Sequence, residues 1–397
     1  MDIYSFSDLL GFPEIAVTHF QIEKSRIVLT CESKLTEKTC PCCLEKCKTV
    51  KQKHQRTIRD LPILGKELYL ELVSRQFSCQ NCSRTFYESF NFVGSHRSMT
   101  TRLEAYLYQC CKDSSFKEVA IRENVLWDVL QNIFDIYSKS TINYLSKKLV
   151  KRIGIDEIAC HKGRNSYATV ITDLDTSEVI DVLDFRTKDE LISYFKAKGS
   201  VFCEQILVFT SDMFEGFSQT AKQVFPNADI IVDRFHLFAH LNEVLNKERQ
   251  LLRKTFPEII AFKQIKWLLF KHWKDLTHPQ KQTLLRAFRL SPTLRKLYFI
   301  KNELVNIFNE NINSEQAQKL IDEWILTAQK LNNNYLNEFT KTIESWKSYI
   351  ITFFKHRLSN GIVEGINNAI KTLKRVAYGF LNFQHFRNRI MVKFANP

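Results

Sequence analysis

The sequence predicts an α/β domain that is interrupted by an α-helical insertion and preceded by a cysteine-rich β module and a helical region. From residue 149 onward, short β-branched runs alternate with helical stretches, which is typical of an α/β sheet. No glycine lies between Gly216 and Gly361, and long helical patterns fill most of that interval. Before residue 95, cysteine pairs stand among runs in which apolar and polar residues alternate.

The composition is that of a globular chain with a basic surface. The 397 residues exceed the usual size of one domain, so about two to four folding units are expected. Lys and Arg outnumber Asp and Glu by 57 to 43, and the net charge is +14. This balance favours a polyanionic partner, nucleic acid first, although a solvated basic surface without a partner is the alternative.

The sequence predicts a cytoplasmic protein with no membrane partner. No apolar run is long enough for a membrane helix, and the N-terminal MDIYSFSDLLGF lacks the features of a signal peptide. In a reducing compartment the 11 cysteines are not expected to form disulfides, so paired cysteines indicate a metal site.

Residues 1–98 are predicted to form a β module that is stapled by zinc. Two C-x2-C pairs supply four thiolates, the ligand set of a structural Zn²⁺: Cys40, Cys43, Cys79 and Cys82. The interval between the pairs is longer than usual, but a β-hairpin there would bring them together. Cys42 and Cys47 are near enough to replace a ligand, so the exact set stays open.

The segment between the two cysteine pairs is basic. Its cations come without an acid among them and predict an edge that contacts phosphates: Lys46, Lys48, Lys51, Lys53, Arg56 and Arg59.

Four further regions complete the predicted organisation. Residues 99–148 have helical spacing, for example from Phe116 to Ile136, and residues 149–241 carry β-like runs such as RIGIDEIA and QILVFTSD. The helical insertion is expected over 242–350, where Trp267 and Trp273 are expected to pack between helices, with stacking on DNA as the alternative. Residues 351–397 predict one long helix, from Ser359 or Asn360 to Gly379.

Two aspartates of the α/β region are candidates for a metal site. Asp156 lies within the apolar run RIGIDEIA, and Asp212 follows QILVFTS at the expected carboxyl end of a strand. Ligands bind at such strand ends, and a divalent cation offsets the cost of burying a carboxylate. Each aspartate taken alone could instead cap a strand end or form a salt bridge.

Glu364 is the one acid in a basic strip. Eight Lys or Arg lie between Lys355 and Lys393, and a lone carboxylate among them suits a metal ligand beside DNA phosphates. A polar stripe continues at helical spacing through Asn368, Lys371 and Arg375. The opposite side is expected to be the core face: Ile362, Ile366, Ala369, Ile370 and Leu373.

Nearly the whole chain resembles the ISL3 family of insertion-sequence transposases. The resemblance is carried by the cysteine module and four runs: IDE at 155–157, SDM at 211–213, VDRFH at 232–236 and SNGIVEGINNAIKTLKRVAYGFLNFQHFRNR at 359–389. It implies an RNase H-like catalytic domain with a helical insertion and a DDE triad of Asp156, Asp212 and Glu364. Asp233 and His236 match a DxxH element of related transposases and would be auxiliary active-site residues, with a helix-capping Asp and a buried His as the alternative.

The resemblance also places a zinc finger at the cysteine module and a helix-turn-helix within 114–137. The acids of that segment outnumber its cations, which is unusual for a helix that enters the major groove, so simple packing is an equal alternative.

The implied activity is DNA strand cleavage and strand transfer with two Mg²⁺ or Mn²⁺ ions. The expected partner is double-stranded DNA, both terminal inverted repeats and target, bound by a homodimer or larger oligomer in the bacterial cytoplasm. The alternatives are an RNase H-like nuclease without strand transfer and a catalytically silent DNA-binding protein derived from a transposase. The expected DNA contacts are Lys51, Lys53, Arg56, Asn368, Lys371, Lys374 and Arg375.

Overall fold

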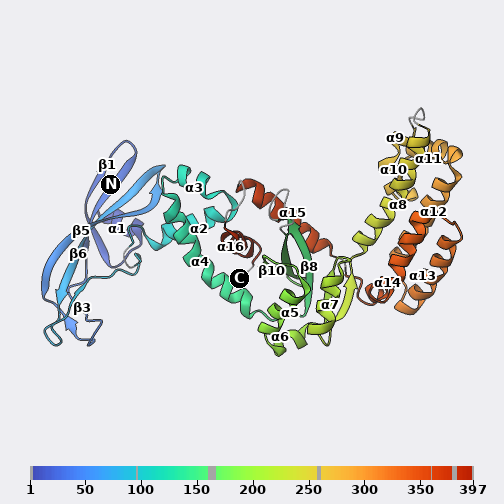
Figure 1. Ribbon diagram of the computed structural model, residues 1–397. Helices are drawn as coiled ribbons and strands as arrows, with labels where there is room; N and C mark the ends of the chain where they lie inside the picture. The colour runs from blue at the N-terminus through green and yellow to red at the C-terminus, as the bar shows by residue number, and fades with distance from the viewer. Residues whose placement is uncertain are drawn as a thin grey trace. The chain divides into compact units, whose positions relative to one another are not determined.

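The computed structural model describes residues 3–94, 97–159, 167–256, 261–358, 360–377 and 382–395. The chain divides into two compact units, Met1–Lys139 with Val376–Tyr378, and Ser140–Arg375 with Gly379–Pro397 (Figure 1). Across the described ranges, every helix is too short or too polar to span a lipid bilayer.

The first unit is built on a five-stranded sheet of order β1-β2-β6-β5, with β7 pairing to β6. The predicted alternation is confirmed on β6, where Leu68, Leu70 and Leu72 are buried between half-buried neighbours. The β5–β6 hairpin turns at Leu64 and Gly65, whose positive φ angles suit the twist of a two-residue turn. The elements are α1 (Ile3–Leu10), β1 (Ile15–Ile22), β2 (Arg26–Ser33), β3 (Lys38–Thr39), β4 (Lys46–Cys47), β5 (Val50–Ile63), β6 (Lys66–Ser78) and β7 (Thr85–Tyr87).

Helices α2 (Thr101–Asp113), α3 (Phe116–Arg122) and α4 (Trp127–Lys147) follow this sheet. A capping box of Ser115 and Glu118 begins α3. The Arg59 guanidinium donates to the carbonyl oxygens of Glu123, at 2.6 Å, and Asn124, at 2.8 Å, where α3 ends. Arg59 therefore holds the turn between α3 and α4, and is not the free phosphate-contacting cation that the basic segment predicts.

The second unit contains a five-stranded sheet of order β10-β9-β8-β11-β12. β8 (Arg152–Ala159), β9 (Tyr167–Asp173) and β10 (Val179–Leu183) form an antiparallel meander, and β11 (Val208–Ser211) and β12 (Asp229–Val232) run parallel to β8. Helices separate the last three strands: α5 (Lys188–Ala197) and α6 (Ser200–Gln205) lie between β10 and β11, and α7 (Glu215–Val224) lies between β11 and β12. The α/β alternation predicted from residue 149 is thus present.

Helices cover both faces of this sheet. Ile153 and Ile155 of β8 pack with Phe195 and Phe217 of α5 and α7 in one core. Ile158 of β8 belongs to the core on the other face, which includes residues of α15 (Gly361–Val376) and α16 (Phe383–Lys393). Because successive strand residues face opposite sides, the even-numbered residues of β8 face α15.

A helical insertion lies between β12 and α15, as predicted. Its first and last helices cross the expected boundaries at 242 and 350, because α8 starts at Arg234 and α14 continues to His356. Trp273 packs against Tyr298 and Phe299, as expected, but the side chain of Trp267 is 67% exposed. The helices are α8 (Arg234–Thr255), α9 (Ala261–Gln264), α10 (Lys266–Phe270), the 3-10 turn Trp273–Asp275, α11 (His278–Leu290), α12 (Pro292–Asn309), α13 (Ser314–Gln329) and α14 (Asn334–His356).

The C-terminal helix is shorter than predicted. α15 ends at Val376 and α16 is a separate helix; Ser359 and Gly379, the expected ends, lie outside the described residues. The expected core position of Ile362 is wrong, because its side chain is 40% exposed. The buried face instead consists of Val363, Ile366, Asn367, Ile370 and Leu373.

Candidate functional site

The four paired cysteines converge in the first unit. Their ligand atoms all lie within 4.8 Å of one another, with Sγ atoms 3.6 Å apart for Cys40 and Cys82 and 3.4 Å apart for Cys43 and Cys79. These separations are too long for disulfides and close to the edge of about 3.8 Å that a tetrahedron with Zn–S bonds of about 2.3 Å has. The cluster therefore fits a structural Zn²⁺.

The β5–β6 hairpin explains the unusual spacing of the cysteine pairs, because it returns the chain to the first pair just before Cys79. The backbone N–H of Cys82 lowers the pKa of the Cys79 thiol to about 6, which favours the thiolate that a metal binds. Cys42 is exposed, and the Sγ of Cys47 lies 3.6 Å from the Glu45 carbonyl oxygen. Neither belongs to the four-sulfur cluster.

In the second unit, three aspartates lie in one row across adjacent parallel strands. Gly154 of β8 pairs with Thr210 of β11, so two residues on, Asp156 and Asp212 lie at the same level. Ser211 pairs with Val232 of β12, and the Asp233 N–H donates to the Ser211 carbonyl oxygen at 2.8 Å, which continues the ladder to Asp233. We call Asp156, Asp212 and Asp233 the acidic row.

The acidic row has a consistent electrostatic signature. Burial raises the pKa of Asp156, and burial raises the pKa of Asp212 to about 6, with the Asp156 carboxylate adding to the latter shift. His236, on the first turn of α8, lowers the pKa of both carboxyl groups, so it lies near both. Asp233 caps α8 by accepting the Phe235 N–H. It also raises the pKa of Asp156, which places it near the same site.

The acidic row offers oxygen donors to a cation. The Oδ1 atom of Asp212 is buried and has no hydrogen-bond partner among the described residues. Clustered carboxylates whose charges disfavour one another are stabilised by a divalent ion, and Mg²⁺ and Mn²⁺ prefer such oxygen ligands.

Helix α15 is attached to the sheet beside this row at three levels. The Thr210 hydroxyl donates to Asn360 Oδ1 at 2.8 Å, just before α15 begins. A Cβ atom on Gly154 would lie 2.6 Å from Val363, so only glycine allows this approach of helix and strand. Nδ2 of Asn367 then donates to Asp156 Oδ2 at 2.7 Å. Two strand residues and four helix residues both advance about 6 Å, so α15 runs along β8.

Glu364 lies on α15 between Val363 and Asn367, with its side chain exposed. Within the described ranges, the four cysteines are the only group of three or more His, Cys, Asp or Glu side chains that lie close enough together to hold a metal ion. Glu364 therefore belongs to the helix that contacts Asp156, but it is not in a tight three-carboxylate cluster with Asp156 and Asp212.

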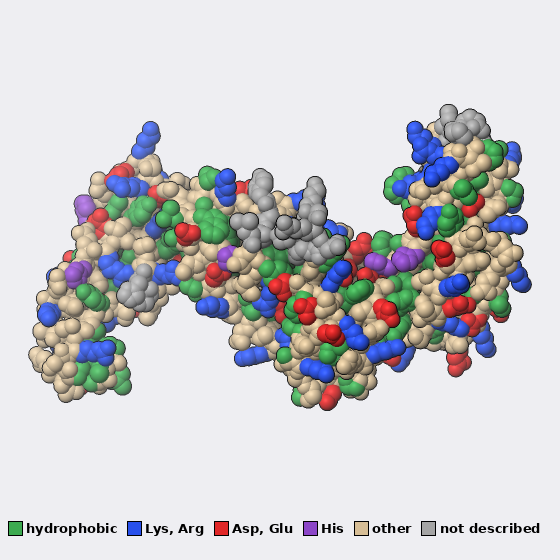
Figure 2. All heavy atoms as spheres, in the orientation of Figure 1, with side chains coloured by type: hydrophobic (Ala, Val, Ile, Leu, Met, Phe, Trp, Pro, Cys, Tyr) green, Lys and Arg blue, Asp and Glu red, His purple; other side chains and the backbone are tan. Residues whose placement is uncertain are grey.

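The predicted DNA-contacting residues differ in how free they are. Lys51, Lys53, Asn368, Lys371 and Arg375 are exposed. Arg375 also donates to the Lys371 carbonyl oxygen of its own helix at 3.4 Å. The other two are less exposed and have shorter backbone hydrogen bonds: Arg56 donates to the Arg97 carbonyl oxygen at 2.8 Å and Lys374 to the Ala159 carbonyl oxygen at 2.9 Å. Lys and Arg side chains are scattered over the visible face of the protein (Figure 2).

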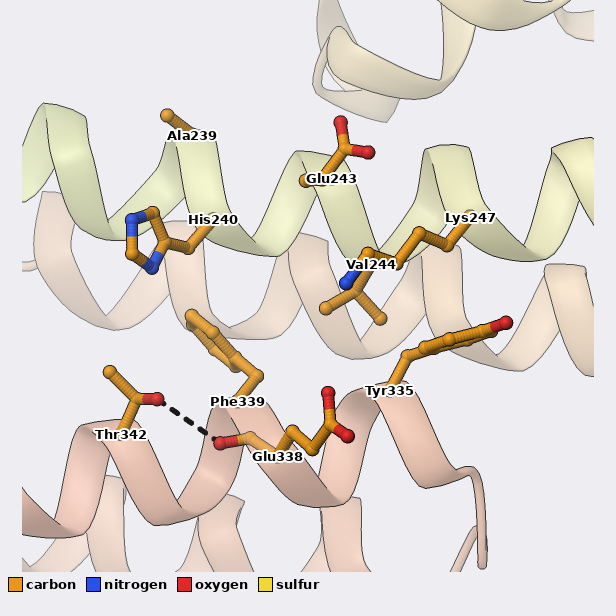
Figure 3. Close-up of a pocket in the computed structure, with 9 residues that line it drawn as sticks. All are labelled: Ala239, His240, Glu243, Val244, Lys247, Tyr335, Glu338, Phe339 and Thr342. Atoms are coloured by element: carbon orange, nitrogen blue, oxygen red, sulfur yellow. Dashed lines mark hydrogen bonds between the residues drawn. The ribbon is translucent and has the colours of Figure 1, made fainter.

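A groove of about 360 Å³ lies between α8 and α14, beyond the acidic row along α8 (Figure 3). His240, one helical turn after His236, lines the groove. Lys247 also lines it, with its ammonium 5.3 Å from the centre of the Tyr335 ring. Desolvation lowers the pKa of His240, and His236 acts in the same direction. The groove thus combines a weakly basic imidazole with an aromatic ring that a cation already covers.

Sequence patterns missed two residues of the site, Asn360 and Asn367. Asn360 was expected only as a helix cap, and the expected polar stripe passed through Asn368 rather than Asn367. Both missed side chains are almost fully buried, with 2% and 3% exposure. Buried amides within an otherwise apolar face were the available signal, because such groups need partners.

Comparisons with known proteins agree with this organisation. A family model described as "Transposase", of the ISL3 DDE type, matches residues 153–390. The "zinc-finger of transposase IS204/IS1001/IS1096/IS1165" matches residues 36–82, and the "Helix-turn-helix domain of transposase family ISL3" matches residues 88–137. The expected zinc finger and helix-turn-helix are thereby confirmed.

Two relatives are similar over much of their length. The chain is 25% identical to a transposase for insertion sequence element IS1001 of Bordetella parapertussis, covering 89% of this chain and 88% of the relative. It is 27% identical to a transposase for IS1557 of Mycobacterium tuberculosis, covering 58% of this chain and 57% of the relative.

Proposed function

We infer the activity from one premise: the chain belongs to the ISL3 transposase family. We propose that it cleaves DNA strands and joins the freed 3′-OH to a target, with Asp156, Asp212 and Glu364 as the catalytic carboxylates. The main support is the parallel register of β8 and β11, by which Asp156 and Asp212 share one face of adjacent strands.

The topology of the second unit supports an RNase H-like catalytic domain. An antiparallel meander of β8, β9 and β10 is followed by two strands parallel to β8, in the order β10-β9-β8-β11-β12. Asp212 and Asp233 lie just beyond the carboxyl ends of β11 and β12, where α/β sheets bind ligands, and they are level with Asp156 within β8.

Mg²⁺ or Mn²⁺ would be held by Asp156 and Asp212, with Glu364 as the third ligand. A bound pair of such ions activates the attacking oxygen and stabilises the leaving oxygen. The chain's own part is to present carboxylates that burial keeps poorly solvated, such as the unpartnered Oδ1 of Asp212. His236 would balance their charge, and Asp233 would anchor the start of α8 beside them.

Glu364 is assigned to the site because its helix is attached on both sides of it. Val363 packs against Gly154, and Asn367 hydrogen-bonds Asp156, so Glu364 lies between two contacts with β8. The exposed Glu364 carboxylate would complete the site in the complex with DNA.

DNA would be bound by the zinc finger that matches residues 36–82, which we call the zinc ribbon, by the helix-turn-helix and by the basic face of α15. The exposed cations Lys51, Lys53, Lys371 and Arg375 suit contacts with phosphates. Arg56, Asn368 and Lys374 would add to them. A homodimer or larger oligomer would pair the terminal repeats and capture the target DNA.

The decisive experiment compares Asp212→Asn with Asp184→Asn. Both aspartates directly follow a strand, but Asp184 is exposed after β10, at the far edge of the sheet. With Mg²⁺ or Mn²⁺, we expect Asp212→Asn to lower cleavage and 3′-end joining by at least about 10³-fold, as loss of a catalytic group does, and Asp184→Asn to retain both.

Each rival function gives a different result. Cleavage without joining by the unaltered protein would indicate a nuclease, and DNA binding without cleavage would indicate a silent descendant. Full joining by Asp212→Asn would remove that residue from the mechanism.

A further inference from the structure

We propose that Asn367 is a positioning residue for Asp156: its amide N–H orients that carboxylate for the divalent ion, and its Oδ1 accepts a hydrogen bond from ion-bound water. This inference rests on the proposed function. It adds a residue that acts through Asp156 and is not one of the three carboxylates.

The contact is direct and buried. Asn367 Nδ2 donates to Asp156 Oδ2 at 2.7 Å, and the Asn367 side chain is 3% exposed. A carboxylate accepts hydrogen bonds and does not donate them, so the amide nitrogen must face Asp156. The Glu157 N–H donates to the other oxygen of Asp156, at 2.7 Å. Together the two donors restrict rotation of the carboxylate plane.

The remaining half of the amide is unused. Asn367 Oδ1 is buried and has no hydrogen-bond partner among the described residues. Because Oδ1 and Nδ2 belong to one planar amide, Oδ1 lies within about 5 Å of Asp156 Oδ2. A buried acceptor without a partner is costly, and ion-bound water beside Asp156 would supply the missing donor.

The position of Asn367 on α15 argues against a role in packing alone. Its neighbours on the buried face are Val363, Ile366, Ile370 and Leu373. An apolar side chain at this position would continue that face without leaving a buried amide, so packing does not explain asparagine here. Asn367 also lies three residues after Glu364, so one helix carries both the proposed third ligand and the support of the first.

The test uses the full chain with Asn367→Leu, which keeps the number and branching of the side-chain heavy atoms and removes both polar atoms. Thr372→Ser is the control, because Thr372 is exposed on the same helix and serine keeps the hydroxyl that Arg375 contacts. Three quantities are measured: Mn²⁺ affinity of the DNA-free protein by electron paramagnetic resonance, DNA cleavage, and melting temperature.

We expect Asn367→Leu to weaken Mn²⁺ binding and cleavage by about 10- to 100-fold, the usual effect of removing a group that orients a metal ligand. Its melting temperature should stay within a few degrees of the unaltered protein, and Thr372→Ser should change none of the three. Added to Asp156→Asn, the Asn367→Leu change should cause no further loss, because Asn367 acts through Asp156.

If Asn367→Leu does not fold, Asn367→Ala takes its place, since alanine favours the helix and also lacks the N–H donor. Unchanged Mn²⁺ affinity in the folded variant would overturn the inference, whether activity is kept or falls together with stability. An additive loss in the double variant would also overturn it. Full cleavage by Asp156→Asn would instead refute the proposed function itself.

Discussion

The zinc ribbon and the acidic row bring metal-binding side chains together in different ways. The four cysteines flank a single hairpin, β5–β6, and their sulfur atoms lie within 4.8 Å of one another. The aspartates of the acidic row come from β8 and from just beyond the ends of β11 and β12, and Glu364, the third proposed catalytic carboxylate, comes from α15. Among the described residues these carboxylates form no group of three that is close enough to hold a metal ion. Local chain closure thus assembles the ribbon, whereas long-range packing assembles the acidic row.

The chemistry of the ligands reinforces this difference. Within each C-x2-C pair, the backbone N–H of the second cysteine stabilises the thiolate of the first. The Cys82 N–H lowers the pKa of Cys79, and the Cys43 N–H lowers the pKa of Cys40. In the acidic row, by contrast, Asp156 raises the pKa of Asp212. A structural site benefits from ligands that the backbone already favours, and a catalytic site benefits from ligands whose charge a substrate or ion must balance.

The sharpest test of the ribbon is Cys79→Ser against Cys42→Ser. A structural Zn²⁺ contributes roughly 10 to 16 kcal/mol to the folding of small zinc modules at pH 7, so loss of a ligand should abolish zinc binding and unfold this module. Zinc content of the reduced protein should fall from about one ion per chain to nearly none in Cys79→Ser. Cys42→Ser should keep its zinc, because Cys42 is exposed and outside the cluster. Stoichiometric zinc in Cys79→Ser would show that Cys79 is not required.

Lys301 provides a contrast to the acidic row, because the chain itself supplies its partners. Its buried ammonium donates to the carbonyl oxygens of Leu269, Phe270 and Lys271 where α10 ends. Asp212 Oδ1, in contrast, has no hydrogen-bond partner in the part of the chain that the structure describes. Desolvation nevertheless lowers the pKa of Lys301 from 10.5 to about 8. Between these pH values the unfolded chain binds more protons than the folded chain, so stability should rise with pH, by about 3 kcal/mol for this group.

The Lys301 prediction is measured by urea unfolding at pH 8 and pH 10, followed by tryptophan fluorescence. Other groups titrate in this range, so the informative quantity is the difference between the unaltered protein and Lys301→Met. Between pH 8 and pH 10 the variant should lack about 2 kcal/mol of the pH-dependent gain, because at pH 10 part of the unfolded-state lysine has already lost its proton. Equal pH dependence in the two proteins would mean that burial does not disfavour the ammonium.

Gly154→Ala tests the close approach that positions α15 beside the acidic row. The new methyl group would lie 2.6 Å from Val363 Cγ2, so strand and helix must separate at a cost of about 1 to 3 kcal/mol. Gly365→Ala is the matched control on α15, since no described atom outside the helix's own backbone lies within 4 Å of its added Cβ. It should gain up to about 1 kcal/mol from helix propensity. Thermal unfolding measures both, and a Gly154→Ala protein as stable as the original would contradict this packing.

Local patterns predicted the elements well where one interaction dominates. Alternation predicted the β module, and glycine-free helical patterns predicted the insertion, because apolar periodicity reports directly on burial. The cysteine pairs predicted the sulfur cluster for a similar reason: few roles other than metal binding bring four thiols together in a reducing compartment.

Local patterns failed where a partner comes from a distant segment. Ile362 was assigned to the core of α15, yet the buried position belongs to Val363, because Gly154 leaves space for it. Arg59 looked like a free cation beside Lys53 and Arg56, but it caps the end of α3. The periodicity of apolar residues predicts how wide the buried face of a helix is. The surface that the helix packs against decides how the helix is rotated about its axis, and so which residues are buried.

From the sequence alone came the cysteine ligands, the α/β alternation, the helical insertion and the identity of three candidate acids, since each depends on residue type and spacing along the chain. Tertiary structure alone decided that Asp156, Asp212 and Asp233 share one row, that α15 runs along β8, and that Asn367 rather than Asn368 contacts Asp156. Strand register and helix rotation are set by packing between segments remote in sequence, so no local pattern contains them.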